Sequence, residues 1–300
     1  SYSQYVQGAY GGMGFPGFQY LASLATRPEY RAFASSLSTE MTRKGIEVTS
    51  KEDDGDSANE RIPVITAEWE RLGITGQWQK AIEHDSLYGR GQLLMNVQGA
   101  DLETPLVLSG NTIKPGSFLG ISAVEAIWTT PAAYNALNPA APDFYRPSEW
   151  FMLGQKVSAS RLLTVVTRPL PDILKPAYNF AGMSLSQLAE PYVENWLRTR
   201  QSVSDLINKF SVTALKTAMD QVLQGGDDGQ DSIVKRAQLF AATRSNLGLM
   251  LLDQEREDLV QINTPLSGLH ELQAQSQEQM CSVSRIPAIV LTGISPSGLN

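Results

Sequence analysis

Apolar side chains recur at helical spacing in several segments of the chain, and the longest of these segments runs from Ser184 to Phe210. Its apolar positions lie three, four or seven residues apart, so they form one stripe along a helix. Ser184 followed by Gln187 has the pattern of a capping box. Pro191 should either bend this helix or move its start to about Glu190, because proline cannot donate a backbone hydrogen bond. The predicted stripe consists of Leu185, Leu188, Tyr192, Trp196, Val203, Leu206 and Phe210.

Shorter helices are predicted on both sides of this segment. Arg27 to Lys44 has Pro28 in its first turn and should bury Tyr30, Phe33, Ala34, Leu37 and Met41. Ala67 to Tyr88 has the same periodicity with interruptions at Gly73 and Gly76. Asp231 can cap a helix from Ser232 to about Asn246, and Leu269 to Ser284 is a last amphipathic helix. The chain is therefore rich in amphipathic helices.

Extended segments separate these helices. Strands are predicted at Ile46–Thr49, at Gln92–Val97, over Phe118–Trp128, and at Leu162–Val166 as a buried strand, and a hairpin is predicted between Leu249–Asp253 and Leu259–Ile262. Irregular segments are predicted at Lys51–Glu60 as a charged break, at Thr129–Ser148 as a Pro/Ala connector, and at Lys175–Gly182 as a turn. The predicted fold class is α+β.

Composition limits the classes of function. The chain has 300 residues, of which 42% are hydrophobic and 18% charged, as in an ordinary globular protein. A net charge of -7 argues against a protein that grips phosphates with a basic face. The charge is compatible with a protein that lets DNA slide past. Cys281 is the only cysteine, so no internal disulfide can form and a reducing compartment is expected. The sequence contains no recognisable signal peptide and no apolar run of about 18 residues, so neither secretion nor a membrane span is predicted.

The sequence offers little catalytic chemistry. Two histidines and one distant thiol are too few for a structural zinc site, and no phosphate-binding or nucleophile motif is present, so neither metal nor cofactor is expected. His84-Asp85-Ser86 matches half of a two-histidine phosphoesterase signature. His270 does not supply the other half, because Glu271 and Leu272 follow it. The favoured interpretation of His84 is a surface histidine near a helix end, with a phosphodiesterase-type hydrolase as the alternative.

An ordered set of segments resembles the portal proteins of tailed bacteriophages. These are RPEYR at 27–31 leading to EMTRKG at 40–45, KPAYNFAGMS at 175–184, and IPA at 286–288 with LTGISPSGLN at 291–300. The last is the most specific, and the set covers the chain from about residue 20 to its end. Family members continue beyond this last stretch, so the chain is expected to be a core region that lacks the C-terminal part.

The resemblance implies a domain plan with a mixed wing domain, two long stem helices flanking a clip, and a channel-side helix. It assigns a flexible N-terminal arm to 1–18, the wing to 19–183, the first stem helix to 184–210, the clip to 211–230, the second stem helix to 231–248, a wing hairpin to 249–268, and the channel-side helix with the start of the channel loop to 269–300. Candidates for contact with DNA in the channel are then Thr292, Ser295, Ser297 and Asn300. Candidates for contact with terminase or adaptor at the clip are Lys216, Asp220, Asp227 and Asp228.

The resemblance also implies the partners. A non-enzymatic homo-oligomeric ring, usually of twelve copies, would occupy one capsid vertex of the virion after assembly in the host cytoplasm. It would contact the major capsid protein, the terminase and a head-tail adaptor, and would pass double-stranded DNA without sequence specificity. A second alternative is another ring component such as a head-tail adaptor, which would lack the paired long helices around a clip.

Overall fold

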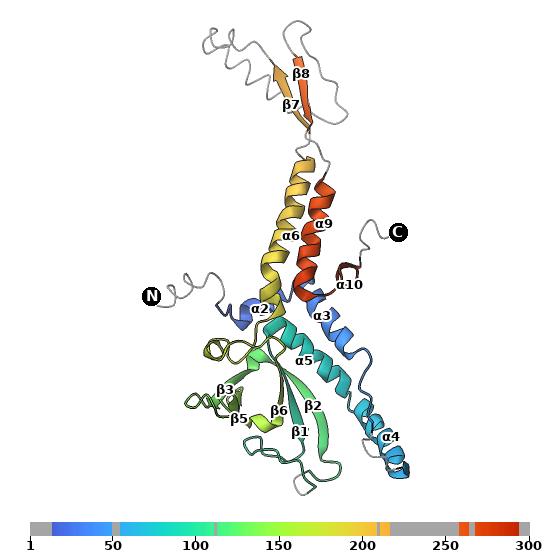
Figure 1. Ribbon diagram of the computed structural model, residues 1–300, viewed down its shortest axis with the longest axis vertical. Helices are drawn as coiled ribbons and strands as arrows, with labels where there is room; N and C mark the ends of the chain where they lie inside the picture. The colour runs from blue at the N-terminus through green and yellow to red at the C-terminus, as the bar shows by residue number, and fades with distance from the viewer. Residues whose placement is uncertain are drawn as a thin grey trace. The chain divides into compact units, whose positions relative to one another are not determined.

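The computed structural model describes residues 14–49, 55–110, 113–208, 211–216, 258–263 and 268–293 (Figure 1). It contains helices and small antiparallel sheets, which confirms the α+β prediction. The α-helices are α2 (Phe18–Leu24), α3 (Pro28–Thr42), α4 (Gly55–Arg71), α5 (Ile74–Tyr88), α6 (Leu185–Asn208), α9 (Leu269–Ser284) and α10 (Ala288–Thr292). The strands are β1 (Gly91–Val97), β2 (Phe118–Glu125), β3 (Thr129–Tyr134), β4 (Pro147–Met152), β5 (Gln155–Ser158), β6 (Leu162–Val165), β7 (Ser211–Lys216) and β8 (Asp258–Asn263).

The chain divides into two compact units. The first comprises Ser1–Trp196 and Ala274–Asn300, and the second comprises Leu197–Gln273. Helix α6 begins in the first unit and ends in the second, whereas α9 begins in the second and ends in the first. The boundary between the units therefore falls within helices and not within loops.

The first unit is built on a three-stranded sheet of order β2-β1-β6. All of its pairings are antiparallel, with Leu93 opposite Ala123 on β2 and opposite Leu163 on β6. Helix α5 packs on β1 and β2, and α3 packs along α5. Leu93 and Ala81 are fully buried between helix and sheet. The predicted strand is confirmed as β6, but Leu163 is 40% exposed because its side chain lines an apolar groove that is open to solvent, so the prediction of full burial is wrong.

A second sheet, of order β3-β4-β5, begins within the segment that the sequence indicated as an irregular connector. That prediction is wrong at both ends of Thr129–Ser148, since β3 and the start of β4 lie there. Pro131 is tolerated because β3 is an edge strand, and the pairing is irregular next to it. The sheet packs over a core that contains Trp150, Val157 and Phe180.

The helices at the start of the chain differ from the prediction in their boundaries. Helix α3 buries Tyr30, Phe33 and Ala34 as expected, but Met41, near its C-terminal end, is 54% exposed. Helix α4 begins at Gly55, so the second half of the predicted charged break is helical. Acidic residues near a helix N-terminus complement its dipole, and a charged composition therefore does not exclude a helix. The predicted strand at 46–49 is wrong, since these residues form no ladder among the described residues.

Helix α6 begins where the cap was predicted. The Ser184 hydroxyl accepts a hydrogen bond from the Gln187 backbone N–H at 3.0 Å, and the helix continues through Pro191, so its start is not displaced. The capping box is only half formed, because the Gln187 Oε1, which would accept a hydrogen bond from the Ser184 N–H, is buried without a hydrogen-bond partner. The predicted stripe is wrong at Leu188 and Tyr192, which are 38% and 42% exposed; the buried residues in the same turns are Leu185, Ala189 and Val193.

The remaining described segments test part of the prediction for the second half of the chain. Strand β8 covers the predicted strand at Leu259–Ile262 and pairs with β7 in antiparallel register. The predicted second stem helix and residues 249–253 lie outside the described residues. Helix α9 has the predicted bounds. After Arg285 the chain forms the short helix α10, whose N-cap residue is Pro287.

Candidate functional site

The root of α6 is fixed to the end of α5 by two glycines. The Gly182 N–H donates to the Gly89 carbonyl at 2.7 Å, and the Met183 N–H donates to the Arg168 carbonyl at 2.9 Å. A Cβ on Gly182 would lie 2.3 Å from the Arg168 carbonyl oxygen, and one on Gly89 would lie 2.1 Å from the Gly182 carbonyl oxygen. Gly89 also has a φ of +84°, which favours glycine. Three backbone segments therefore meet too closely for any side chain.

A buried ion pair ties the same three segments together. Asp85 of α5 is 1% exposed and accepts a hydrogen bond from Arg168 at 3.1 Å and one from the Thr167 N–H at 3.1 Å. Arg168 also donates through Nε to the Met183 carbonyl at 2.9 Å. Burial raises the pKa of Asp85 and lowers the pKa of Arg168, because each charged form loses water. The pair holds the start of α6 in one orientation relative to α5.

Arg90 is fully buried without an acidic partner. Its guanidinium donates to the carbonyls of Ala126 at 2.9 Å and Thr129 at 2.8 Å, to the Thr129 hydroxyl at 2.8 Å, and to the Asn179 carbonyl. It lies 4.4 Å from the centre of the Trp150 ring. Burial lowers its pKa to about 9. Arg90 is enclosed by backbone carbonyls, so its charge connects the two sheets and is not available to bind DNA.

The N-terminal helices contact the first turns of α6 on its surface. The Tyr20 hydroxyl donates to Glu190, and Arg27 pairs with Glu194 at 2.7 Å. Two further contacts are made by aromatic rings: Phe15 packs on Tyr178, and Phe18 packs on Tyr88. The root of α6 is thus held from several directions, while Leu188 and Tyr192, which share one face of the helix, are left exposed.

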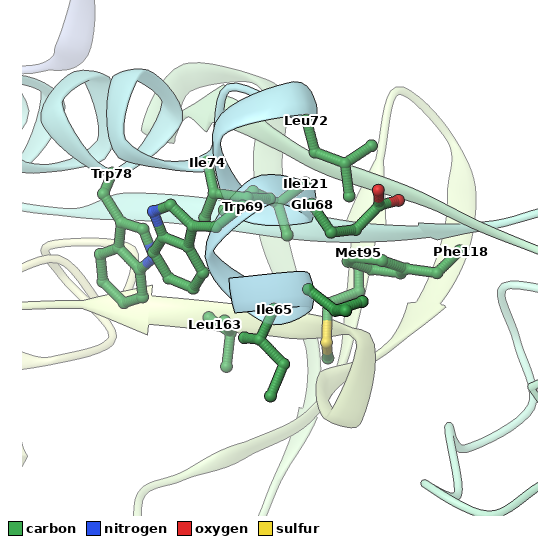
Figure 2. Close-up of a pocket in the computed structure, with 11 residues that line it drawn as sticks. Ile65, Glu68, Trp69, Leu72, Ile74, Trp78, Met95, Phe118, Ile121 and Leu163 are labelled. Atoms are coloured by element: carbon green, nitrogen blue, oxygen red, sulfur yellow. The ribbon is translucent and has the colours of Figure 1, made fainter. Parts of the chain in front are cut away.

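An apolar groove of about 480 Å³ lies between α4, the start of α5 and the β2-β1-β6 sheet (Figure 2). Figure 2 shows Trp69 and Trp78 at one end of the view and Met95 and Phe118 at the other. Its residues are Val64, Ile65, Glu68, Trp69, Leu72, Ile74, Trp78, Met95, Phe118, Ile121 and Leu163. Glu68 is the only charged residue among them and is hydrogen-bonded to Arg71 at 2.8 Å.

Much of this apolar surface is accessible to solvent. Val64 is 67% exposed and Ile65 is 48% exposed, both on α4. Large exposed apolar patches on soluble proteins commonly mark interaction sites. With a single carboxylate that is already paired, the groove has the chemistry of a docking surface for an apolar segment and not that of a catalytic centre.

The environment of His84 corrects the expectation of a surface histidine. Its side chain is 16% exposed, its Nε2 lies 3.9 Å from Glu125, and its Nδ1 is buried without a hydrogen-bond partner. Burial lowers the pKa of His84, and the charge of Glu125 opposes this shift. His84 lines a cavity of about 590 Å³ with residues that include Lys80 and Trp128. His270 belongs to the other compact unit, so no paired imidazole is found beside His84 within its unit.

The predicted contact residues fall mostly outside the described part of the chain. Thr292 is the last residue of α10, and its hydroxyl donates to the Ala288 carbonyl at 2.7 Å. Lys216 is the last residue of β7 and lies opposite Asp258 of β8. Ser295, Ser297, Asn300, Asp220, Asp227 and Asp228 lie outside the described residues. The channel and clip assignments remain predictions.

Within the described ranges, no group of three or more His, Cys, Asp or Glu residues could hold a metal ion. No helix in that part of the chain is both long and apolar enough to cross a membrane.

Sequence reasoning missed the junction at the root of α6 and the groove. One feature of the sequence could have indicated the junction: Gly89 and Gly91 flank Arg90 directly after a predicted helix, and such glycines mark close backbone approach. No feature of the sequence indicated the groove, because its residues come from five separate elements that only the fold brings together.

Comparison with known families finds a match to a family described as phage portal protein, over residues 18–300. None of the curated proteins matches. Among solved structures, a chain from the neck of an empty GTA particle computed with C6 symmetry is 14% identical, with a TM-score of 0.48; the match covers 91% of this chain and 68% of that one. A chain from the neck of a native GTA particle computed with C12 symmetry is 13% identical, with a TM-score of 0.44; the match covers 75% of this chain and 58% of that one. An HK97 family phage portal protein from Corynebacterium diphtheriae is 11% identical, with a TM-score of 0.41; the match covers 93% of this chain and 81% of that one.

Proposed function

The chain belongs to the phage portal protein family, and from this premise we propose that it is the subunit of a closed ring through which double-stranded DNA enters and leaves a tailed-phage capsid. The observation that carries the proposal is the family match over residues 18–300, nearly the whole chain. The ring would contain twelve copies at one vertex of the virion. It would be assembled in the host cytoplasm, and its role would be structural and not catalytic.

The proposed partners follow from this position. The ring would contact the major capsid protein around its edge, the terminase during packaging, and a head-tail adaptor afterwards. The net charge of -7 supports a channel that does not retain DNA, because few cations in an acidic background give weak phosphate contacts. The residues proposed for contact with DNA remain Thr292, Ser295, Ser297 and Asn300. Those proposed for the clip remain Lys216, Asp220, Asp227 and Asp228.

The junction at the root of α6 supports a ring subunit for a physical reason. A ring closes only if each copy presents its two contact surfaces at the same angle, and an incorrect angle produces an open helix of subunits. The contacts among Gly89, Gly182, Asp85 and Arg168 fix the first turns of α6 against α5. Each copy would therefore offer the exposed Leu188 and Tyr192 to its neighbour in one orientation.

The test is the oligomeric state of the purified chain, measured by mass photometry and by negative-stain electron microscopy. We expect ring-shaped particles of uniform size, with a mass that is a multiple of 32.8 kDa. A homogeneous monomer under all conditions, including in the presence of capsid and scaffold proteins, would contradict the proposal.

A further inference from the structure

The apolar groove between α4 and the sheet needs an occupant, because its exposed apolar lining is costly in water. We propose that residues 1–13 of one copy bind in the groove of the neighbouring copy. The proposal rests on the proposed ring and goes beyond it, since it names the segment that joins adjacent subunits.

The chemistry of the segment matches that of the groove. Residues 1–13 read SYSQYVQGAYGGM and contain no Asp, Glu, Lys or Arg, while Tyr2, Tyr5, Val6, Tyr10 and Met13 supply aromatic and apolar side chains. The groove presents two tryptophans and aliphatic side chains, and its one carboxylate is paired with Arg71. An uncharged, tyrosine-rich segment can bury its rings there without leaving a charge unpaired.

The segment also starts from a fixed point. The Gly14 carbonyl accepts a hydrogen bond from the Gln187 side chain at 3.2 Å, and Phe15 packs on Phe18 and Tyr178 at the root of α6. An extended chain spans at most about 3.3–3.6 Å per residue, so residues 1–13 reach about 45 Å from Gly14. This length exceeds the roughly 15 Å of helix that separates Trp78 from Tyr88 along α5, so distance alone lets the segment reach the groove of its own copy or that of an adjacent copy.

The symmetry of a ring favours the neighbour as the recipient. A ring of identical subunits uses a heterologous interface, in which two different surfaces of each copy are complementary. The groove and the segment 1–13 form such a pair, since each copy offers one of each. When the ring is closed every groove is filled and every segment is bound.

Disulfide cross-linking between mixed chains tests the proposal. In a Cys281→Ser background, chains with Tyr5→Cys are mixed with chains carrying Ile65→Cys, assembled, and oxidised gently. We expect covalent dimers on a non-reducing gel. Replacing Ile65→Cys by Leu137→Cys, at a loop residue that is 95% exposed, should abolish them. Assembled rings without cross-linked dimers overturn the proposal. A third sample contains a single chain that carries both Tyr5→Cys and Ile65→Cys. If a disulfide forms only within that chain, and not between chains, the proposal is also overturned.

A second measurement does not depend on introduced cysteines. Deleting residues 1–13, or introducing Leu163→Asp in the groove, should raise the concentration at which rings dissociate by about tenfold or more. Combined, the two changes should have no more effect than one, because they remove the same contact. Leu119→Asp, at a residue that is 58% exposed on β2 and outside the groove, should leave the ring unchanged. If the wild-type chain forms rings and the effects of the deletion and of Leu163→Asp on the dissociation concentration add, the inference is overturned and the proposed function is not. If the wild-type chain forms no ring, the proposed function is overturned as well.

Discussion

At the scale of single residues, the fold contains buried positions at which most side chains would be unfavourable, and the surrounding backbone explains why the residues found there fit. Arg90 keeps its hydrogen bonds inside the protein by donating to carbonyls, although burial lowers its pKa to about 9. Gly182 has no side chain, and the space beside it is filled by the Arg168 carbonyl. His84 is held in a partly buried cavity in which its neutral form is favoured. Gly182 thereby positions the start of α6, and Arg90 connects the two sheets.

The close approach at Gly182 predicts a steep cost for the smallest side chain. Gly182→Ala should lower the free energy of unfolding by at least about 1–3 kcal/mol, because backbone atoms must move to admit the methyl group. The matched control is Gly76→Ala, inside α5 with no atom within 4 Å of its Cβ position. It should stabilise the protein by about 0.5–1 kcal/mol. Urea denaturation measures both changes, and equal effects would contradict the steric explanation.

His84 predicts a pH dependence of stability with a definite sign. Burial lowers its pKa below the ordinary value of 6.5, so below pH 6.5 the unfolded chain binds a proton that the folded chain does not. The free energy of unfolding should therefore fall as the pH decreases through 6.5 towards the folded-state pKa. His84→Gln should remove this part of the slope. Denaturation curves at about pH 7, 6 and 5 provide the measurement, and identical slopes in both proteins would refute the assignment.

At the scale of elements, periodicity predicted the long helices better than the sheets. Helices α6 and α9 begin where the sequence placed them, because a stripe over several turns and a serine cap are strong local signals. Strand β3 and the start of β4 were missed because Pro131, Pro147 and the alanines between them resemble a connector. The edge position of β3, which makes Pro131 acceptable, is set by tertiary pairing and not by local sequence.

Pro191 lies inside α6, where it removes one backbone hydrogen bond. Pro191→Ala should restore that bond and raise the free energy of unfolding by about 1–3 kcal/mol. Arg198→Ala, at another exposed position of the same helix, should change it by less than about 0.5 kcal/mol. Thermal and urea unfolding of both variants give the comparison. A destabilised Pro191→Ala chain would indicate that a proline-induced bend is required by the packing of α6 in the first unit.

At the scale of the whole molecule, the chain leaves apolar surface in places that suit assembly. Leu188 and Tyr192 share an exposed face of α6, and the groove exposes Val64 and Ile65. A rigid root for α6 and separate apolar surfaces are the properties that a ring subunit requires, since a closed ring needs a fixed angle and complementary contacts.

The exposed face of α6 predicts a variant that affects assembly and not folding. Leu188→Asp should weaken the ring by about tenfold or more in dissociation concentration, because a charge would be buried between copies. The unfolding of the isolated chain should change little, since the residue is already 38% exposed. Ser202→Asp, at an exposed polar position of the same helix, is the control. Mass photometry across a dilution series measures dissociation, and equal behaviour of the two variants would contradict a subunit contact at Leu188.

The sequence by itself determined helices α3, α5, α6 and α9, the α+β class and the family, because these depend on local periodicity, capping and ordered motifs that are read along the chain. Tertiary structure alone decided which face of α6 is buried, how β3 and β4 pair, and that Gly182, Asp85 and Arg168 meet at one junction. It also assembled the groove from five elements. The physical reason is that burial and close approach arise between residues that are distant in sequence, and no local pattern records which partner each of them meets.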